Sequence, residues 1–381
     1  MQWPRLLRNT LRGGSDGSGN VQSAKMGISA LEKKTLDIID KLERNHGLPL
    51  EEYALLLETR TPQVAEELAR RAVAVRQGIY GTAVFTRGLV EVSSYCRNDC
   101  SYCGIRCGNA QATRYRLSPD TIVASADSGY DLGFRTFVLQ GGEDPWFTDE
   151  RLCSVVRRIK AVHPDCAVTL SMGERSRESY AALREAGADR YLLRHEAASR
   201  ELYAALHPAT MSYDNRMRCL QDLRELGYAV GVGFMVGAPG QTVAHLAEDL
   251  QFIERFQPEM CGIGPFVPHH ATPFANEPGG TAELTCFLLS IIRLIKPNIL
   301  LPATTALGTI DPVGRERGIQ SGANVVMPNL SPVDVRKHYD LYDNKICTGE
   351  EAAECRGCLG ARMLSIGYEL VVDRGDPAVS Q

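Results

Sequence analysis

Hydrophobic residues follow two patterns along the chain, and the change falls near Gly81. In the preceding stretch, residues 30–80, apolar positions such as Leu31, Ile38 and Leu42 recur at helical spacing. After Gly81, short apolar runs alternate with longer amphipathic stretches, which is typical of repeated βα units around a parallel sheet. The pattern therefore predicts a helical lead-in followed by an α/β domain.

Eight short apolar segments after Gly81 have the composition of buried strands. They are residues 83–93, 136–139, 167–171, 190–193, 229–235, 260–266, 299–304 and 324–327. The stretches between them begin at good helix caps, among them Ser118, Thr148, Ser176 and Ser212. Eight βα units over about 250 residues predict a (β/α)8 TIM-type barrel. An open, doubly wound sheet is the alternative, because periodicity does not show whether a sheet closes.

The same pattern divides the chain into four parts. Residues 1–27 are rich in Arg, Gly and Ser, so we expect a disordered tail; a targeting segment for organellar import and a plain extension before Met26 are the alternatives. Residues 28–80 form the helical lead-in, and residues 81–330 form the barrel. Residues 331–381 form a C-terminal extension that carries a second group of cysteines.

The composition narrows the class of protein. With 44% hydrophobic and 23% charged residues, the chain is neither wholly disordered nor a coiled coil. The formal net charge of −4 favours neither a nucleic-acid nor an anionic-membrane partner, and no apolar run approaches the roughly 18 residues of a membrane span. Twelve cysteines without a secretory apolar segment indicate metal or redox chemistry in a reducing compartment, the cytoplasm.

Three closely spaced cysteines follow the first predicted strand: Cys96, Cys100 and Cys103. Three thiolates on a short loop can hold three irons of a 4Fe-4S cluster and leave the fourth iron without a protein ligand. That iron can bind the amino and carboxylate groups of S-adenosylmethionine, whose cleavage gives a 5'-deoxyadenosyl radical. A structural zinc site with Cys107 as the fourth ligand is the alternative.

Two further groups of candidate metal ligands occur later in the chain. Cys347, Cys355 and Cys358 have metal-like spacing and predict a second iron-sulfur cluster, with free or zinc-bound thiols as the alternative. His269 and His270 follow the sixth predicted strand. Adjacent residues of an extended segment point in opposite directions, so we do not expect these histidines to share an ion.

A series of longer motifs extends from Tyr95 to Cys358. The runs are YCRNDCSYCGIR, VLQGGEDP, VTLSMGE, ADRYLLRHE, GFMVGAPGQT, GIGPFVPH, PATTALGTIDPVGRE, GANVVMPNLSP and LYDNKIC. Through these runs the chain closely resembles the HydE family, the radical SAM maturases of FeFe-hydrogenase. The resemblance implies a (β/α)8 barrel with the cluster at its mouth, in agreement with the count of strands.

The resemblance also implies roles for individual residues. Tyr102 flanks the nucleoside of S-adenosylmethionine, as in the radical SAM superfamily, and Gln140, Glu196 and Arg216 match family positions that contact this cofactor. Simple ion pairing between Arg and Glu at the barrel mouth is the alternative interpretation. The residues that match the family's substrate and anion sites are Thr169, Arg194, Thr304, Thr305 and Tyr342.

The activity implied by the resemblance is assembly of the diiron subcluster of FeFe-hydrogenase. The 5'-deoxyadenosyl radical would attack a cysteine-bound Fe(CO)2(CN) unit inside the barrel, and the partners would be the maturases HydG and HydF and an electron donor. The alternatives are a methylornithine-synthase-like or biotin-synthase-like enzyme and a non-catalytic iron-sulfur carrier.

Overall fold

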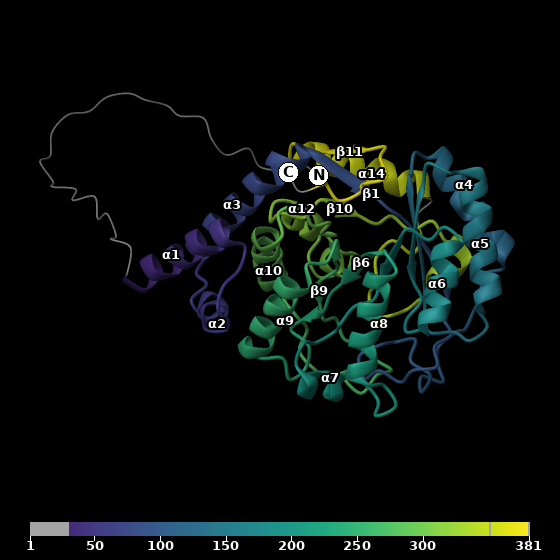
Figure 1. Cartoon of the computed structure of the whole chain (residues 1–381), viewed down its shortest axis with the longest axis horizontal. Coiled ribbons are helices and arrows are strands. Elements are labelled where there is room, and N and C mark those ends of the chain that lie inside the picture. The colour runs from purple at the N-terminus through teal and green to yellow at the C-terminus, as the bar shows by residue number, and fades with distance from the viewer. Residues whose placement is uncertain (1–29, 350–351, 380–381) are drawn as a thin grey trace, which may run out of the picture.

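The computed structural model describes residues 30–349 and 352–379 (Figure 1). The predicted tail, residues 1–27, lies outside the described residues. None of the helices in the described ranges is long and apolar enough to cross a membrane.

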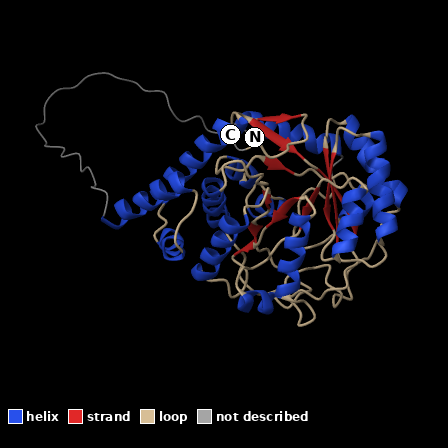
Figure 2. Ribbon diagram, in the orientation of Figure 1, coloured by secondary structure: helices blue, strands red, loops and turns tan. Residues whose placement is uncertain are grey.

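Six parallel strands form the main sheet, drawn as red arrows in Figure 2. In spatial order they are β2 (Gly88–Ser93), β3 (Thr136–Gly141), β4 (Ala167–Ser171), β5 (Arg190–Leu192), β6 (Ala229–Val232) and β8 (Met260–Cys261). Most of their residues are buried, as in a parallel sheet that is covered on both faces and therefore consists of nearly continuous apolar runs.

Single parallel bridges close this sheet into a ring. Met260 of β8 pairs with Leu300, Pro302 pairs with Val325, and Asn329 pairs with Leu89 of β2. The predicted barrel is therefore confirmed, and the open sheet is wrong. The predicted strand 299–304 makes only these isolated bridges, and Pro302 within it has no backbone N–H to donate.

Three of the predicted strands are interrupted. The segment 83–93 breaks at Arg87, and its first part, β1 (Ala83–Thr86), pairs with β10 (Val325–Val326) and β11 (Glu369–Val371). The other two breaks lie in segments 229–235 and 260–266, beyond which the short strands β7 (Met235–Val236) and β9 (Gly264–Pro265) form a separate pair. At the first of these breaks the backbones approach so closely that a Cβ on Gly233 would collide with the carbonyl group of Gly262.

Helices cover the outside of the barrel, as Figures 1 and 2 show. The four predicted caps are confirmed, because the hydroxyls of Ser118, Thr148, Ser176 and Ser212 each accept a backbone N–H of the first turn. The helices between the strands are α4 (Pro119–Asp131), α5 (Asp149–Val162), α6 (Arg177–Glu185), α7 (Arg200–Leu206), α8 (Tyr213–Glu225), α9 (Val243–Phe256), α10 (Ala282–Ile295), α11 (Thr305–Ile310) and α12 (Gly314–Ile319).

The N-terminal stretch is helical as predicted. It consists of α1 (Ala30–Asn45), α2 (Leu50–Glu58) and α3 (Pro62–Tyr80), which pack on α9 and α10. One half-buried carboxylate joins this layer to the barrel, because Glu254 Oε2 accepts the hydroxyl of Tyr53 at 2.7 Å and the backbone N–H of Leu48 at 3.2 Å. The lead-in is therefore part of the same hydrophobic core as the barrel.

The C-terminal part of the chain touches both ends of the barrel. After α13 (Val333–Arg336) it contributes to the mouth, and after α14 (Ala352–Ser365) and β11 it returns to the opposite end. There the buried guanidinium of Arg190 donates to the carbonyl oxygen of Arg374 at 2.9 Å and to Asp376 Oδ1 at 2.6 Å. This ion pair fixes the last described segment beneath the barrel floor.

Removal of the carboxylate should therefore destabilise the protein. We expect Asp376→Ala to lower the free energy of unfolding by about 1–2 kcal/mol, because Arg190 stays buried while Asp376 itself is half exposed to screening solvent. Urea denaturation followed by circular dichroism measures this change. Asp334→Ala, at an exposed position of α13, is the matched control, and equal midpoints for the two variants would contradict the assignment.

Candidate functional site

The three cysteines of the first motif lie on the loop that leaves the carboxyl end of β2, the end at which barrel enzymes carry their chemistry. The guanidinium of Arg114 stabilises the loop by hydrogen bonds to its backbone. It donates to the carbonyl oxygens of Ile105 at 2.7 Å and Arg106 at 2.6 Å. The side-chain amide of Asn109 donates to the carbonyl oxygen of Gly104 at 2.7 Å. The conformation of the loop is therefore held by its own backbone carbonyls.

The loop after β3 packs directly against this cysteine loop. A Cβ on Gly142 would lie 2.7 Å from the Cβ of Cys96 and still closer to the carbonyl oxygen of Tyr95, so only glycine fits. The N–H of Arg97 donates to the carbonyl oxygen of Glu143 at 3.0 Å, and their side chains form an ion pair at 2.9 Å. The QGG run of the sequence is thus one wall of the cysteine site.

The three thiols are desolvated. Burial, together with the neighbouring Cys96, raises the pKa of Cys103 to about 12. Burial also raises the pKa values of Cys96 and Cys100. The thiols are therefore protonated at neutral pH, and a metal that binds them must displace these protons.

The spacing of the sulfur atoms bears on which metal centre they fit. Among the described residues, the one group that brings three candidate ligand atoms within 4.8 Å of one another is His269, His270 and Asp343. At least one pair of the sulfurs of Cys96, Cys100 and Cys103 is therefore more than 4.8 Å apart, beyond the about 3.8 Å between sulfurs of a tetrahedral zinc site. Such a separation fits a cluster in which each thiolate binds a different iron.

A buried histidine orients Tyr102. The Tyr102 hydroxyl donates to His207 Nε2 at 3.2 Å, and His207 Nδ1 donates to the carbonyl oxygen of Tyr203 at 2.8 Å. We assign this tautomer from the backbone carbonyl, which can only accept. Burial lowers the pKa of His207 to about 4, so the ring is neutral and fixes the phenol beside the cysteine loop.

A cavity of about 240 Å³ opens inside the barrel mouth next to this loop. Its wall brings together eight of the residues singled out in the sequence, although they are spread over most of the chain. They are Tyr102, Cys103, Gln140, Arg194, Thr304, Thr305, Tyr342 and Cys347. Most of the remaining lining is apolar, including Leu89, Leu192 and Met327.

Three other predicted residues lie close to this cavity without lining it. Glu196 has a left-handed backbone (φ 63°), and its Oε2 is 3.2 Å from Arg194 Nη2. Arg216 is buried and donates to Glu174 Oε1 at 2.7 Å. Ion pairing between Arg and Glu at the barrel mouth, the alternative to cofactor binding, is therefore present in the structure. The hydroxyl of Thr169, on β4, is buried and has no hydrogen-bond partner among the described residues.

The three C-terminal cysteines lie in different environments. Cys347 is half-buried and lies in the cavity wall, with Arg315 Nη2 at 3.4 Å from its sulfur. Cys355 is buried and Cys358 is exposed, and both belong to α14, where residues three apart share a face. The role of these cysteines stays a prediction.

The two adjacent histidines do not point apart as expected. Their rings stack at 4.3 Å between centroids with a 23° angle, because the chain turns at His270 and the alternation of a strand ends. The N–H of Ala271 donates to His269 Nδ1 at 3.1 Å, so Nε2 carries the proton and donates to Asp340 Oδ2 at 3.2 Å. This arrangement holds the C-terminal segment against the cysteine loop.

Sequence reasoning missed a polar group in the same cavity wall. Glu91, Asn329 and Lys345 line the cavity and bind one another. The sequence does contain an indication of a role for Glu91, which is the single acidic residue within the apolar run of the first predicted strand. Lys345 lies in the LYDNKIC run, but no feature of the sequence pairs it with a residue 254 positions away.

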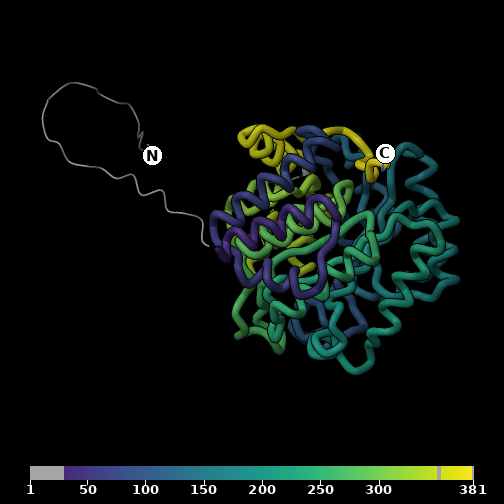
Figure 3. Tube along the Cα trace, turned by 60° about the vertical axis from the view of Figure 1, so that its left-hand side comes forward, coloured from purple at the N-terminus to yellow at the C-terminus, as the bar shows by residue number. Residues whose placement is uncertain are grey.

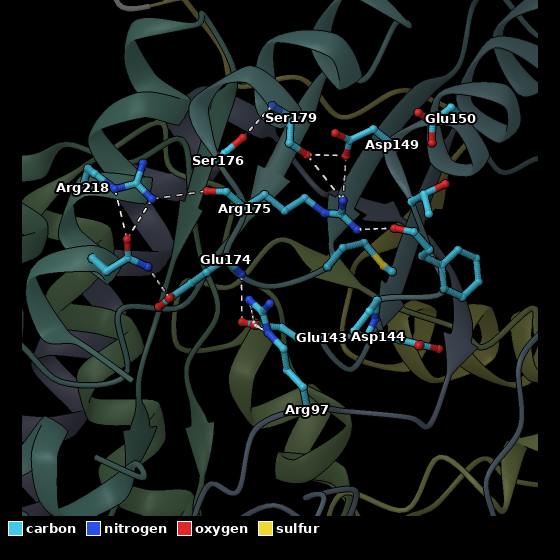
Figure 4. A pocket seen from close by; sticks show the side chains of 15 residues that line it. Arg97, Glu143, Asp144, Asp149, Glu150, Glu174, Arg175, Ser176, Ser179 and Arg218 are labelled. Atoms are coloured by element: carbon cyan, nitrogen blue, oxygen red, sulfur yellow. Dashed lines mark hydrogen bonds and ion pairs between the residues drawn. The ribbon is translucent and has the colours of Figure 1, made fainter. Parts of the chain in front are cut away.

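A larger polar groove of about 570 Å³ lies outside the barrel mouth (Figure 4). Figure 4 shows two of its arginines paired with carboxylates: Arg175 binds Asp149 at 2.9 Å, and Arg97 binds Glu143 at 2.9 Å. None of the cysteines lines this groove. The smaller cavity, which is lined by Cys103 of the cysteine loop and by four of the five predicted substrate residues, is therefore the candidate active site.

Comparisons with known proteins agree with this geometry. The Radical SAM superfamily matches residues 90–253. The chain is 44% identical over 323 residues to the FeFe hydrogenase maturase subunit HydE of Thermotoga maritima, which covers 85% of this chain and 92% of that protein. Methylornithine synthase (PylB) has a similar structure, with a TM-score of 0.77 and 26% identity over 88% of this chain and 97% of that one. The maturase HydG shares the fold, with a TM-score of 0.74 and 22% identity over 88% and 75% of the two chains.

The neutral state of His207 should make stability depend on pH. Because the folded-state pKa is about 4 and the usual value is 6.5, the unfolded chain binds the extra proton first as the pH falls. We expect the wild type to lose stability from about pH 6.5 down to pH 4, with a slope up to about 1.4 kcal/mol per pH unit greater than that of His207→Gln. Urea denaturation at several pH values measures both slopes, and parallel curves would contradict this prediction.

Proposed function

The chain belongs to the HydE family of radical SAM enzymes, and from this membership we propose that it acts in assembly of the diiron subcluster of FeFe-hydrogenase. Its substrate in this proposal is a cysteine-bound Fe(CO)2(CN) unit. The observation that carries the proposal is the single cavity that the cysteine loop shares with a wall of hydroxyls and cations.

The family uses a 4Fe-4S cluster and S-adenosylmethionine, and the residues of this chain fit both. We assign the cluster to Cys96, Cys100 and Cys103, which share one loop and have at least one pair of sulfurs more than 4.8 Å apart, as suits a polynuclear centre. When bound, the cluster supplies the electron that cleaves a carbon-sulfur bond of S-adenosylmethionine to give the 5'-deoxyadenosyl radical. The protein contributes a loop that is already fixed before the metal arrives.

Four residues are proposed to hold S-adenosylmethionine. Glu196 and Arg216 carry opposite charges, as the zwitterionic methionyl group requires, and Arg216 is kept in place by Glu174. Gln140 lines the cavity and donates to the hydroxyl of Tyr339 at 3.4 Å. Tyr102 has a fixed ring that is available to flank the nucleoside.

The substrate is proposed to occupy the rest of the cavity. Arg194 supplies positive charge for an anionic iron species, and Tyr342 and Thr305 supply hydroxyls. Thr304 Oγ1 accepts the backbone N–H of Leu307 at 3.3 Å, so its own hydrogen remains available as a donor. Thr169 adds a buried hydroxyl without a partner among the described residues. A largely apolar wall excludes water from the radical chemistry.

The remaining assignments concern the surroundings of the reaction. We propose that Cys347, Cys355 and Cys358 hold a second iron-sulfur cluster that is not required for turnover. The proposed partners are the maturases HydG and HydF and a low-potential electron donor. Because the cysteines must stay reduced, the proposed location is the cytoplasm.

Substitution of one cluster ligand tests the radical chemistry. We expect Cys100→Ala to abolish formation of 5'-deoxyadenosine under dithionite, because the cluster loses one of its three thiolates. Iron content and 5'-deoxyadenosine are measured after anaerobic reconstitution. Cys107→Ala, at an exposed cysteine of the same loop, is the matched control and should retain both. Zinc instead of iron in the wild type, lost in Cys107→Ala, would support the zinc site.

A maturation assay tests the proposed pathway. FeFe-hydrogenase activity should appear only when this protein is present together with HydG, HydF and a reductant. Hydrogenase activity without this protein would contradict the proposal. Formation of 3-methylornithine or biotin by the reduced enzyme would favour the alternative radical SAM activities, and transfer of iron without consumption of S-adenosylmethionine would favour a carrier.

A further inference from the structure

A buried ion pair forms part of the cavity wall. Lys345 Nζ lies 2.6 Å from Glu91 Oε1, and the two side chains are 8% and 1% exposed. The other oxygen of Glu91 accepts the side-chain amide of Asn329 at 2.8 Å. The carboxylate therefore already uses both of its oxygens within the protein.

The ammonium group is not saturated in the same way. It has three N–H donors, of which one binds Glu91 and a second binds the carbonyl oxygen of Tyr339 at 2.8 Å. The Tyr339 ring lies beside it, with its centroid 5.0 Å from Nζ. Because Lys345 lines the cavity, its remaining N–H is available to a molecule inside it.

A purely structural role does not account well for this pair. Replacement of a buried ion pair by apolar side chains often leaves stability unchanged or raises it, because both charges must be desolvated. The surrounding wall is largely apolar, with Leu89, Met327 and Ile346 as neighbours in the lining. A charge that is kept at such a position is better explained by a ligand of opposite charge.

A second cation faces the same cavity. Arg194 lines it; its Nη2 lies 3.2 Å from Glu196 Oε2, and its buried Nε has no hydrogen-bond partner among the described residues. The lining thus presents N–H donors from two cations, while their carboxylate partners are Glu91 in the wall and Glu196 outside the lining. Charged donors of this kind suit an anionic group placed in the cavity.

Building on the proposed function, we infer that Lys345 is a specificity-determining residue that binds a negatively charged group of the iron-containing substrate. Glu91 and Asn329 orient the ammonium from the barrel side. The segment that carries Lys345 is fixed at the mouth, since the N–H of Asp343 donates to the carbonyl oxygen of Pro268 at 3.0 Å. The substrate thereby contacts two walls of the cavity, one formed by the barrel strands and one by the C-terminal segment.

The probe for this inference is a synthetic anionic Fe(CO)2(CN) complex of L-cysteine. Equilibrium dialysis against the full, reconstituted chain, with infrared detection of the CO and CN bands, gives its dissociation constant. We expect Lys345→Met to weaken binding about ten- to a hundredfold, as for loss of a charged hydrogen bond. Glu91→Gln should weaken binding less than Lys345→Met, because the glutamine oxygen still accepts an N–H of the ammonium and keeps it oriented.

Two further variants separate recognition from folding. Glu91→Gln/Lys345→Met leaves no unpaired buried charge, so it should fold and still bind weakly. Lys337→Met, at an exposed lysine of the same segment, is the charge-matched control and should bind normally. If Glu91→Gln weakens binding as much as Lys345→Met, or if the double variant binds normally, the inference is overturned. If the wild type itself binds no complex, the proposed function fails, and the inference falls with it.

Discussion

Close approach between backbones around the cysteine loop is the constraint on which the site depends. On one side Gly142 leaves room for the carbonyl of Tyr95, and on the other side a Cβ on Gly104 would lie 2.7 Å from His269 Nε2. The loop is therefore packed between the turn after β3 and the C-terminal segment. Three thiols on such a loop keep a fixed spacing, and a metal cluster can bind without paying for the ordering of its ligands.

Three polar side chains of the mouth share one feature. A second residue holds each of them in place and leaves some of its atoms free to contact a ligand. His207 fixes Tyr102, Glu174 fixes Arg216, and Glu91 fixes Lys345. Such pairing orients the donors before a ligand arrives, and the apolar lining strengthens their electrostatic effect because water is excluded. A site of this kind suits a radical reaction, in which placement matters more than proton transfer.

The sequence was sufficient for features that are specified locally. The caps at Ser118 and Ser176 and the cysteine spacing depend on a few neighbouring residues, and the strands depend on apolar runs. Closure of the barrel was predictable only from the number of βα units, since the last bridges at Leu300 and Pro302 are isolated pairs. The Glu91–Lys345 pair was not predictable, because nothing in either local context indicates the other. The expectation that His269 and His270 point in opposite directions was wrong because the chain turns at His270 and is no longer extended.

The C-terminal part of the chain contributes at both ends of the barrel, with Lys345 at the mouth and Asp376 beneath the floor. These residues follow every barrel strand in the chain, so a ribosome adds them last. A nascent chain can thus carry all three cysteines of the first motif while its reaction chamber still lacks a wall. Premature termination before Asp340 would leave the cysteine loop without one of its two supports and without the enclosure that confines a reactive radical.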